Sequence, residues 1–66
     1  MDAYQETLQT FLRRMSEAAI TFDQTAELLD IEPYQLQAAL DGEEPTLSMR
    51  LMPKVLAIYR QYILEA

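Results

Sequence analysis

Apolar residues in the first third of the chain recur at steps of three and four. This spacing is typical of an amphipathic helix that buries one face. The polar residues Glu6, Gln9, Arg13 and Glu17 fall on the opposite face. The pattern therefore predicts a helix that begins at about residue 4. Its apolar stripe comprises Tyr4, Leu8, Phe11, Leu12, Met15 and Ala19.

Capping residues predict two further short helices in the middle of the chain. Thr21, with Gln24 three residues later, has the pattern of a capping box and predicts a helix over 22–30. Pro33 suits the first turn of a helix, where its missing N–H costs nothing, and predicts a helix over 33–41. Gly42 stands where a left-handed C-terminal cap is required. The residues expected to be buried are Phe22, Ala26, Leu29, Leu36, Ala39 and Leu40.

Two apolar stripes run side by side along the C-terminal third. Thr46 is expected to cap a helix over 47–52, and Pro53 either to kink that helix or to begin a fifth one. Two stripes are wider than one packing face of a small bundle needs. The first comprises Leu51, Val55, Ile58 and Tyr62, and the second comprises Met52, Leu56, Tyr59 and Ile63. The whole pattern predicts one all-α domain over 1–66, compact and built from four to five helices.

Composition narrows the classes of function. The chain has 66 residues and contains neither cysteine nor histidine. This excludes disulfides and thiolate zinc sites, and it removes the usual general base and the commonest metal ligand. We therefore expect no enzymatic activity, no cofactor and no metal site. The acidic, polar start and the lack of a long apolar run predict a cytoplasmic protein without a signal peptide or a membrane span.

The segment 21–47, TFDQTAELLDIEPYQLQAALDGEEPTL, resembles the helix-turn-helix of the phage repressor and Cro (lambda-repressor-like) family. Thr21 matches the start of the first motif helix, Ala26 its small packing position, and Leu36 the buried aliphatic residue of the recognition helix. Leu29 and Ile31 flank the turn, Gly42 closes the recognition helix, and Pro45-Thr46-Leu47 opens the next one. The family usually has glycine where this chain has Asp30, although aspartate tolerates the left-handed conformation. The resemblance implies a helix-turn-helix over about 21–42 and, in most such domains, DNA binding.

The resemblance also assigns base-reading positions to the start of the recognition helix. In this chain they are residues 32–35 and 37, of which Gln35 and Gln37 could hydrogen-bond a base and Tyr34 offers one hydroxyl. Glu32 and Pro33 offer nothing to a phosphate. In a DNA-binding interpretation, phosphates would be contacted by Arg13, Arg14 or Arg50.

The charge distribution argues against operator binding. The formal charge is −6, and the segment from Met15 to Met49 contains eight acidic residues and no basic one. These acids are Glu17, Asp23, Glu27, Asp30, Glu32, Asp41, Glu43 and Glu44. Since phosphate contacts supply much of the affinity for DNA, a motif with this charge would repel a duplex.

The acidic cluster has three interpretations: a solvated face, a surface that binds a basic protein, or a cation site. The segment Asp41-Gly42-Glu43-Glu44 is too short for a calcium loop, which disfavours the third. The candidate residues for partner binding are Glu32, Tyr34, Gln35, Gln37, Asp41, Glu43 and Glu44. Near the C-terminus, Tyr59, Tyr62 and Ile63 either complete the core or form a surface for a homodimer or another partner.

Compact phage and mobile-element regulators of the family that this chain resembles include proteins that bind a repressor. We therefore predict a small acidic transcription-regulatory protein that acts through protein–protein contact, such as an antirepressor or co-regulator. A Cro-like DNA-binding repressor is the second interpretation, and a phage-encoded inhibitor of a host protein is the third.

Overall fold

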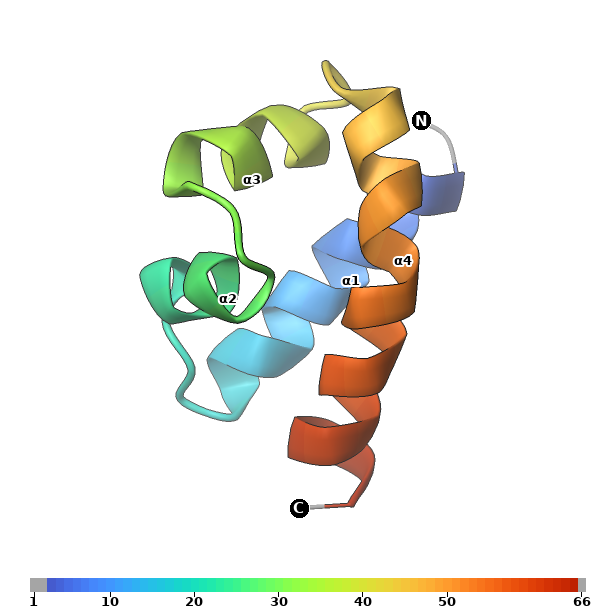
Figure 1. The fold of residues 1–66 in the computed structure, drawn as a ribbon. Helices are drawn as coiled ribbons and strands as arrows, with labels where there is room; N and C mark the ends of the chain where they lie inside the picture. Colours follow the sequence, from blue (N-terminus) through green and yellow to red (C-terminus); the bar gives the residue numbers. More distant parts are fainter. Residues whose placement is uncertain (1–2, 66) are drawn as a thin grey trace.

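The computed structural model describes residues 3–65, which fold into four helices without a strand (Figure 1). The helices are α1 (Ala3–Glu17), α2 (Phe22–Leu28), α3 (Pro33–Leu40) and α4 (Pro45–Tyr59). A π-helical turn, η1 (Arg60–Leu64), continues α4 without a break. The predicted all-α fold is confirmed. Over residues 3–65, no helix combines the length and the apolar character needed to cross a bilayer.

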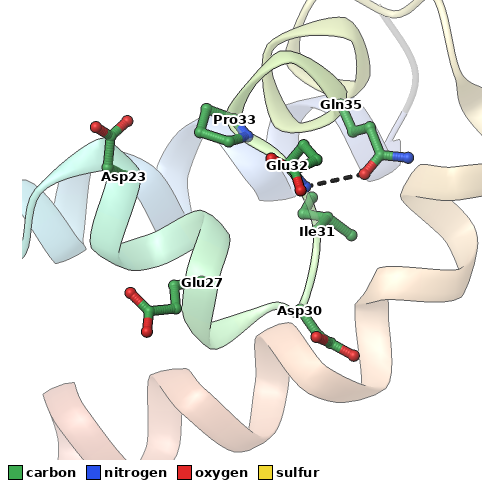
Figure 2. Close-up of a pocket in the computed structure, with 7 residues that line it drawn as sticks. All are labelled: Asp23, Glu27, Asp30, Ile31, Glu32, Pro33 and Gln35. Carbon is green, nitrogen blue, oxygen red and sulfur yellow. Dashed lines mark hydrogen bonds between the residues drawn. The ribbon is translucent and has the colours of Figure 1, made fainter.

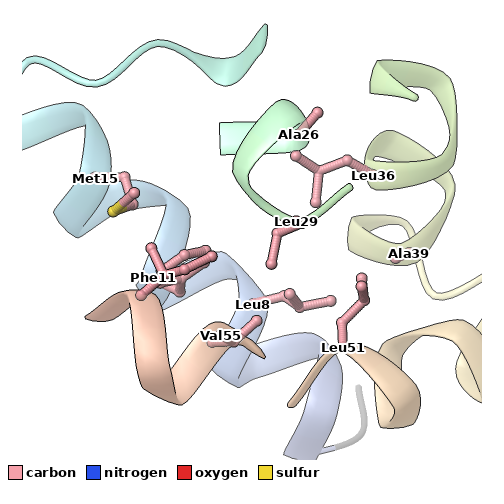
Figure 3. Close-up of a cluster of buried hydrophobic side chains, with 10 residues drawn as sticks. Leu8, Phe11, Met15, Ala26, Leu29, Leu36, Ala39, Leu51 and Val55 are labelled. Carbon is pink, nitrogen blue, oxygen red and sulfur yellow. The ribbon is translucent and has the colours of Figure 1, made fainter. Parts of the chain in front are cut away.

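The helix α1 packs against α2, α3 and α4, and so holds the fold together. Figure 1 shows α2 and α3 on one side of the α1–α4 pair, with the start of α4 beside the N-terminal end of α1. The core between the helices consists of apolar side chains from all four of them (Figure 3). Its buried members are Leu8, Phe11, Met15, Ala26, Leu29, Leu36, Ala39, Leu51, Val55 and Ile58. All of them lie on an apolar stripe or among the residues that the sequence analysis expects to be buried.

Helices α1, α2 and α3 all end in the same hydrogen-bonded motif. In each, one residue has a positive φ: Ala19 (65°), Asp30 (61°) and Gly42 (80°). The next N–H donates back across the turn to a carbonyl five residues earlier, as in Ile31 to Ala26 at 3.1 Å. This is the Schellman motif, which satisfies carbonyls that the helix leaves unpaired. The predicted left-handed conformations of Asp30 and Gly42 are confirmed.

The predicted cap at the start of α2 is also confirmed. The Thr21 hydroxyl accepts the Gln24 N–H at 3.1 Å, and the Gln24 side chain accepts the Thr21 N–H at 2.9 Å. Pro33 is the first residue of α3, as predicted. At the other end of α3, the Leu40 carbonyl accepts hydrogen bonds from Gln5 (3.0 Å) and Gln9 (3.4 Å) of α1. These bonds fix the segment that leads from α3 to α4.

Two sequence predictions were wrong, and one of the two alternatives for Pro53 is excluded. The first helix ends at Glu17, so that Ala19 is exposed in the left-handed turn rather than part of the apolar stripe. The last helix begins at Pro45, with Glu44 at its N-cap, and Thr46 is not a cap. Pro53 lies inside α4 and begins no fifth helix.

The prediction of two stripes on the last helix is confirmed. Leu51, Val55 and Ile58 of the first stripe are buried, whereas Tyr62 remains partly exposed. In the second stripe, Leu56 is 64% exposed. Met52, Tyr59 and Ile63 are half-buried at the edge of the core. The first stripe is therefore mostly buried in the core, whereas the second packs only partly against its edge.

Candidate functional site: the outward face of α3

The exposed side of α3 presents an aromatic residue beside an amide and a carboxylate. Tyr34, Gln37 and Asp41 follow one another at steps of three and four, which places them on one face of the helix. Tyr34 is 73% exposed, and the Gln37 Nε2 donates a hydrogen bond to the Asp41 Oδ1 at 3.0 Å. Three of the seven residues predicted for partner binding therefore lie together on the surface.

Gln35 has a structural role that the sequence analysis did not assign. Its side chain is half-buried, and its Oε1 accepts the Glu32 N–H at 2.9 Å, at the N-terminus of α3 (Figure 2). The bond satisfies a backbone donor that the first turn of a helix leaves unpaired. The spacing of a residue at the cap and a glutamine three positions later signals this role.

A shallow hollow between α2 and α3 is lined mainly by carboxylates (Figure 2). Asp23, Glu27, Asp30 and Glu32 surround it, together with Ile31, Pro33 and Gln35. Figure 2 shows the carboxylates of Asp23, Glu27 and Asp30 pointing in different directions rather than toward one centre. Consistently, residues 3–65 contain no group of three or more acidic side chains that could hold a metal ion. The hollow therefore presents negative charge to any protein surface that binds over it.

A second hollow lies between α3 and the start of α4. It is lined by Tyr34, Gln35, Ala38, Glu44 and Leu47. Gln35 lines both hollows, so that the two form one surface, which we call the α3 surface. The members that the sequence analysis did not select for partner binding are Asp23, Glu27, Asp30, Ile31, Pro33, Ala38 and Leu47. Ala38 follows Tyr34 by four residues, and this helical spacing indicates that the two lie on the same face of α3. No local pattern indicates that Leu47 joins them, because Leu47 belongs to α4.

Every acidic side chain between Met15 and Met49 is exposed. Over the described part of the chain, the one ion pair joins Arg14 to Glu17 at 3.8 Å, with both side chains more than half exposed. An exposed pair of this kind stabilises a protein by about 1 kcal/mol at most. The negative charge around the α3 surface is thus left without local basic partners.

The basic residues lie on other elements. Arg13 and Arg14 belong to the second half of α1, and Arg50 belongs to α4. All three are exposed, and none lines either hollow of the α3 surface. Glu43, in the segment between α3 and α4, is exposed and outside both hollows.

The structure separates the two tyrosines predicted for a dimer or partner surface. Tyr59 lines a groove between α1 and α4, whereas Tyr62 lines a different hollow with Ile20 and Leu28. Ile63 is half-buried and packs against the edge of the core.

No protein-family model, curated protein or solved structure matches this chain. The helix-turn-helix and the relationship to phage repressors and Cro proteins therefore stay predictions from the sequence.

Proposed function

We propose that this chain is a small transcription-regulatory protein that acts by binding another protein, as an antirepressor or co-regulator, rather than by catalysis. The observation that carries the proposal is the α3 surface: exposed carboxylates line one of its hollows, Tyr34 and Glu44 line the other, and no basic side chain lines either. The complementary partner has a basic face, such as the DNA-binding face of a repressor.

Two physical effects give this surface its affinity and its choice of partner. Clustered carboxylates attract a basic face over a distance and orient it before contact, which raises the association rate. Tyr34 then supplies the apolar contact, because an exposed tyrosine beside Ala38 and Leu47 can bury its ring in an interface. A repressor held in this way has its phosphate-binding side chains occupied and is displaced from DNA.

A Cro-like DNA-binding repressor is the second candidate function. It is favoured by the resemblance and by the exposure of Tyr34 and Gln37 on the outward face of α3. Against it stand the acids of the α3 surface, which would lie closest to the phosphates. A phage-encoded inhibitor of a host protein, the third interpretation, would use the same acidic surface on a different basic partner.

The proposal is tested with a repressor whose gene neighbours the gene of this chain. In the assay, this chain and the operator DNA compete for that repressor. The purified repressor is bound to fluorescently labelled operator DNA, and this chain is added while the anisotropy is recorded. We expect the anisotropy to fall as the chain displaces the DNA. An undiminished signal at a large excess of the chain would refute the antirepressor function.

Charge-reversal variants locate the surface that makes the contact. Replacing both glutamates, Glu43→Lys and Glu44→Lys, should weaken the complex by more than about tenfold, because Glu44 lines the α3 surface and Glu43 is its neighbour in the chain. The control Glu65→Lys adds positive charge near the C-terminus and should leave the Kd within about twofold. An unchanged Kd for the double variant would remove Glu43 and Glu44 from the contact. An equal loss in the control would show that only net charge matters.

A further inference from the structure

We infer that α4 and the turn η1 that continues it carry a second, partly exposed packing seam through which two copies of this chain associate. The seam consists of Met49, Met52, Leu56, Tyr59 and Ile63, at steps of three, four, three and four. This is the a/d spacing with which paired helices interlock their side chains. The inference is independent of the function proposed for the α3 surface.

The same spacing occurs on the neighbouring stripe of α4, where the fold uses it. Ser48, Leu51, Val55 and Ile58 are buried against the other helices. The seam repeats this pattern one residue further along, but Met49 and Leu56 remain 51% and 64% exposed. An apolar line of this length on a surface is typical of an interaction site.

The seam borders a groove between α4 and α1. Phe11 and Val55, both buried, lie at its base, and Leu56 and Tyr59 line its α4 side. Thr7 and Thr10 line the α1 side with their short side chains. A side chain of a second helix can therefore enter between α1 and α4 and reach the apolar base.

Charge favours a second copy of the chain as the occupant. Two copies that each carry a formal charge of −6 repel one another unless they meet away from their acidic segments. The seam lies on α4 and η1, away from the acid-rich α2 and α3. Among the described residues, Glu6 lines the groove beside it, and the step of four between Leu56 and Arg60 places a base beside it. In a two-fold symmetric pair each copy offers both charges to the other. Arg50 and Lys54 lie on the other flank of α4 and do not oppose one another across the seam.

The length of the seam sets the expected strength of the dimer. From Met49 to Ile63 it extends about 21 Å at the rise of an α-helix. So short a seam is expected to form only a small interface, and small interfaces are typical of weak complexes. We therefore expect a dimer that forms as the concentration rises from about 1 to about 500 μM.

Sedimentation equilibrium of the full chain over this concentration range tests the inference. The apparent mass should rise from 7.7 kDa toward twice that value. Leu56→Glu places a charge in the seam and should weaken association by at least about tenfold. The control Ala57→Glu adds the same charge at the next, exposed position of α4, outside the seam, and should still dimerise. Circular dichroism of both variants checks that each is folded.

Three outcomes would overturn the inference. The first is a monomer at every concentration. The second is a wild-type dimer that Leu56→Glu does not weaken while the variant remains folded. The third is an equal loss of association in Ala57→Glu, which would mean that added charge rather than the seam governs association. None of these results depends on whether the chain binds a repressor.

Discussion

Replacing Gly42 with alanine should destabilise the fold, because this residue closes α3 and directs the chain toward α4. Its φ of +80° is a conformation that residues with a Cβ rarely adopt. A Cβ built at this position would lie 3.0 Å from the Gln5 Oε1 and 3.1 Å from the Gln5 Nε2. The Gln5 side chain cannot move freely, since its Nε2 donates a hydrogen bond to the Leu40 carbonyl at 3.0 Å.

The magnitude follows from three effects. The left-handed conformation costs alanine about 1–2 kcal/mol. Displacing Gln5 weakens a hydrogen bond worth about 0.5–1.5 kcal/mol. Alanine also restricts the unfolded chain, which returns about 0.4–1 kcal/mol. The net loss is about 0.5–3 kcal/mol, a large part of the stability of a small domain.

Urea unfolding followed by circular dichroism measures this loss, and Gly42→Asn is the matched control. Asparagine carries the same Cβ but tolerates the left-handed conformation, so that it should lose less stability than alanine. In a Gln5→Ala background, the cost of Gly42→Ala should shrink, because no side chain has to be displaced. A Gly42→Ala variant as stable as the wild type would refute this reasoning.

Three further changes test the remaining structural assignments by the same unfolding assay. Leu36→Ala empties a fully buried position and should cost about 2–5 kcal/mol, so that a loss below about 1 kcal/mol would contradict its place in the core. Thr21→Ala removes a side-chain cap of α2 and should cost about 1 kcal/mol, whereas an unchanged midpoint would mean that the cap contributes nothing. Ala19→Gly relieves a positive φ and should leave the protein as stable or up to about 1 kcal/mol more stable; a clear loss would contradict that conformation.

The sequence predicted those features that depend on local chemistry. Thr21 and Gln24 cap α2 because both partners lie within one turn of the chain. Pro33 and Gly42 mark a helix start and a helix end because each has a restricted or unusual backbone preference. Asp30 adopts the left-handed conformation in the turn after α2, which aspartate tolerates better than most residues.

The features that were missed depend on competition between neighbouring signals or on tertiary packing. Ala19 continues the apolar spacing of α1, yet the helix ends before it, since the Schellman motif places the next residue, Ile20, at the edge of the core. Pro45 takes the first position of α4, where a missing N–H costs nothing, and so moves the cap away from Thr46. Pro53 does not end α4 because buried residues on both sides of it, Leu51 and Val55, hold the helix against the core.

In the candidate site, too, local features could be predicted from the sequence, whereas features that depend on tertiary packing could not. The exposure of Tyr34 and the acidic character of its surroundings follow from the sequence alone. The approach of Glu44 and Leu47 to Tyr34 does not, because it depends on how α4 packs beside α3.

Binding of generic duplex DNA by fluorescence anisotropy tests the central claim most directly, which is that the α3 surface serves a protein partner rather than DNA. The titration is made at about 20 mM salt, where phosphate contacts are strongest, and repeated at about 200 mM. The account predicts no binding at either concentration. Micromolar binding at low salt that collapses at high salt would contradict it and would favour the Cro-like function.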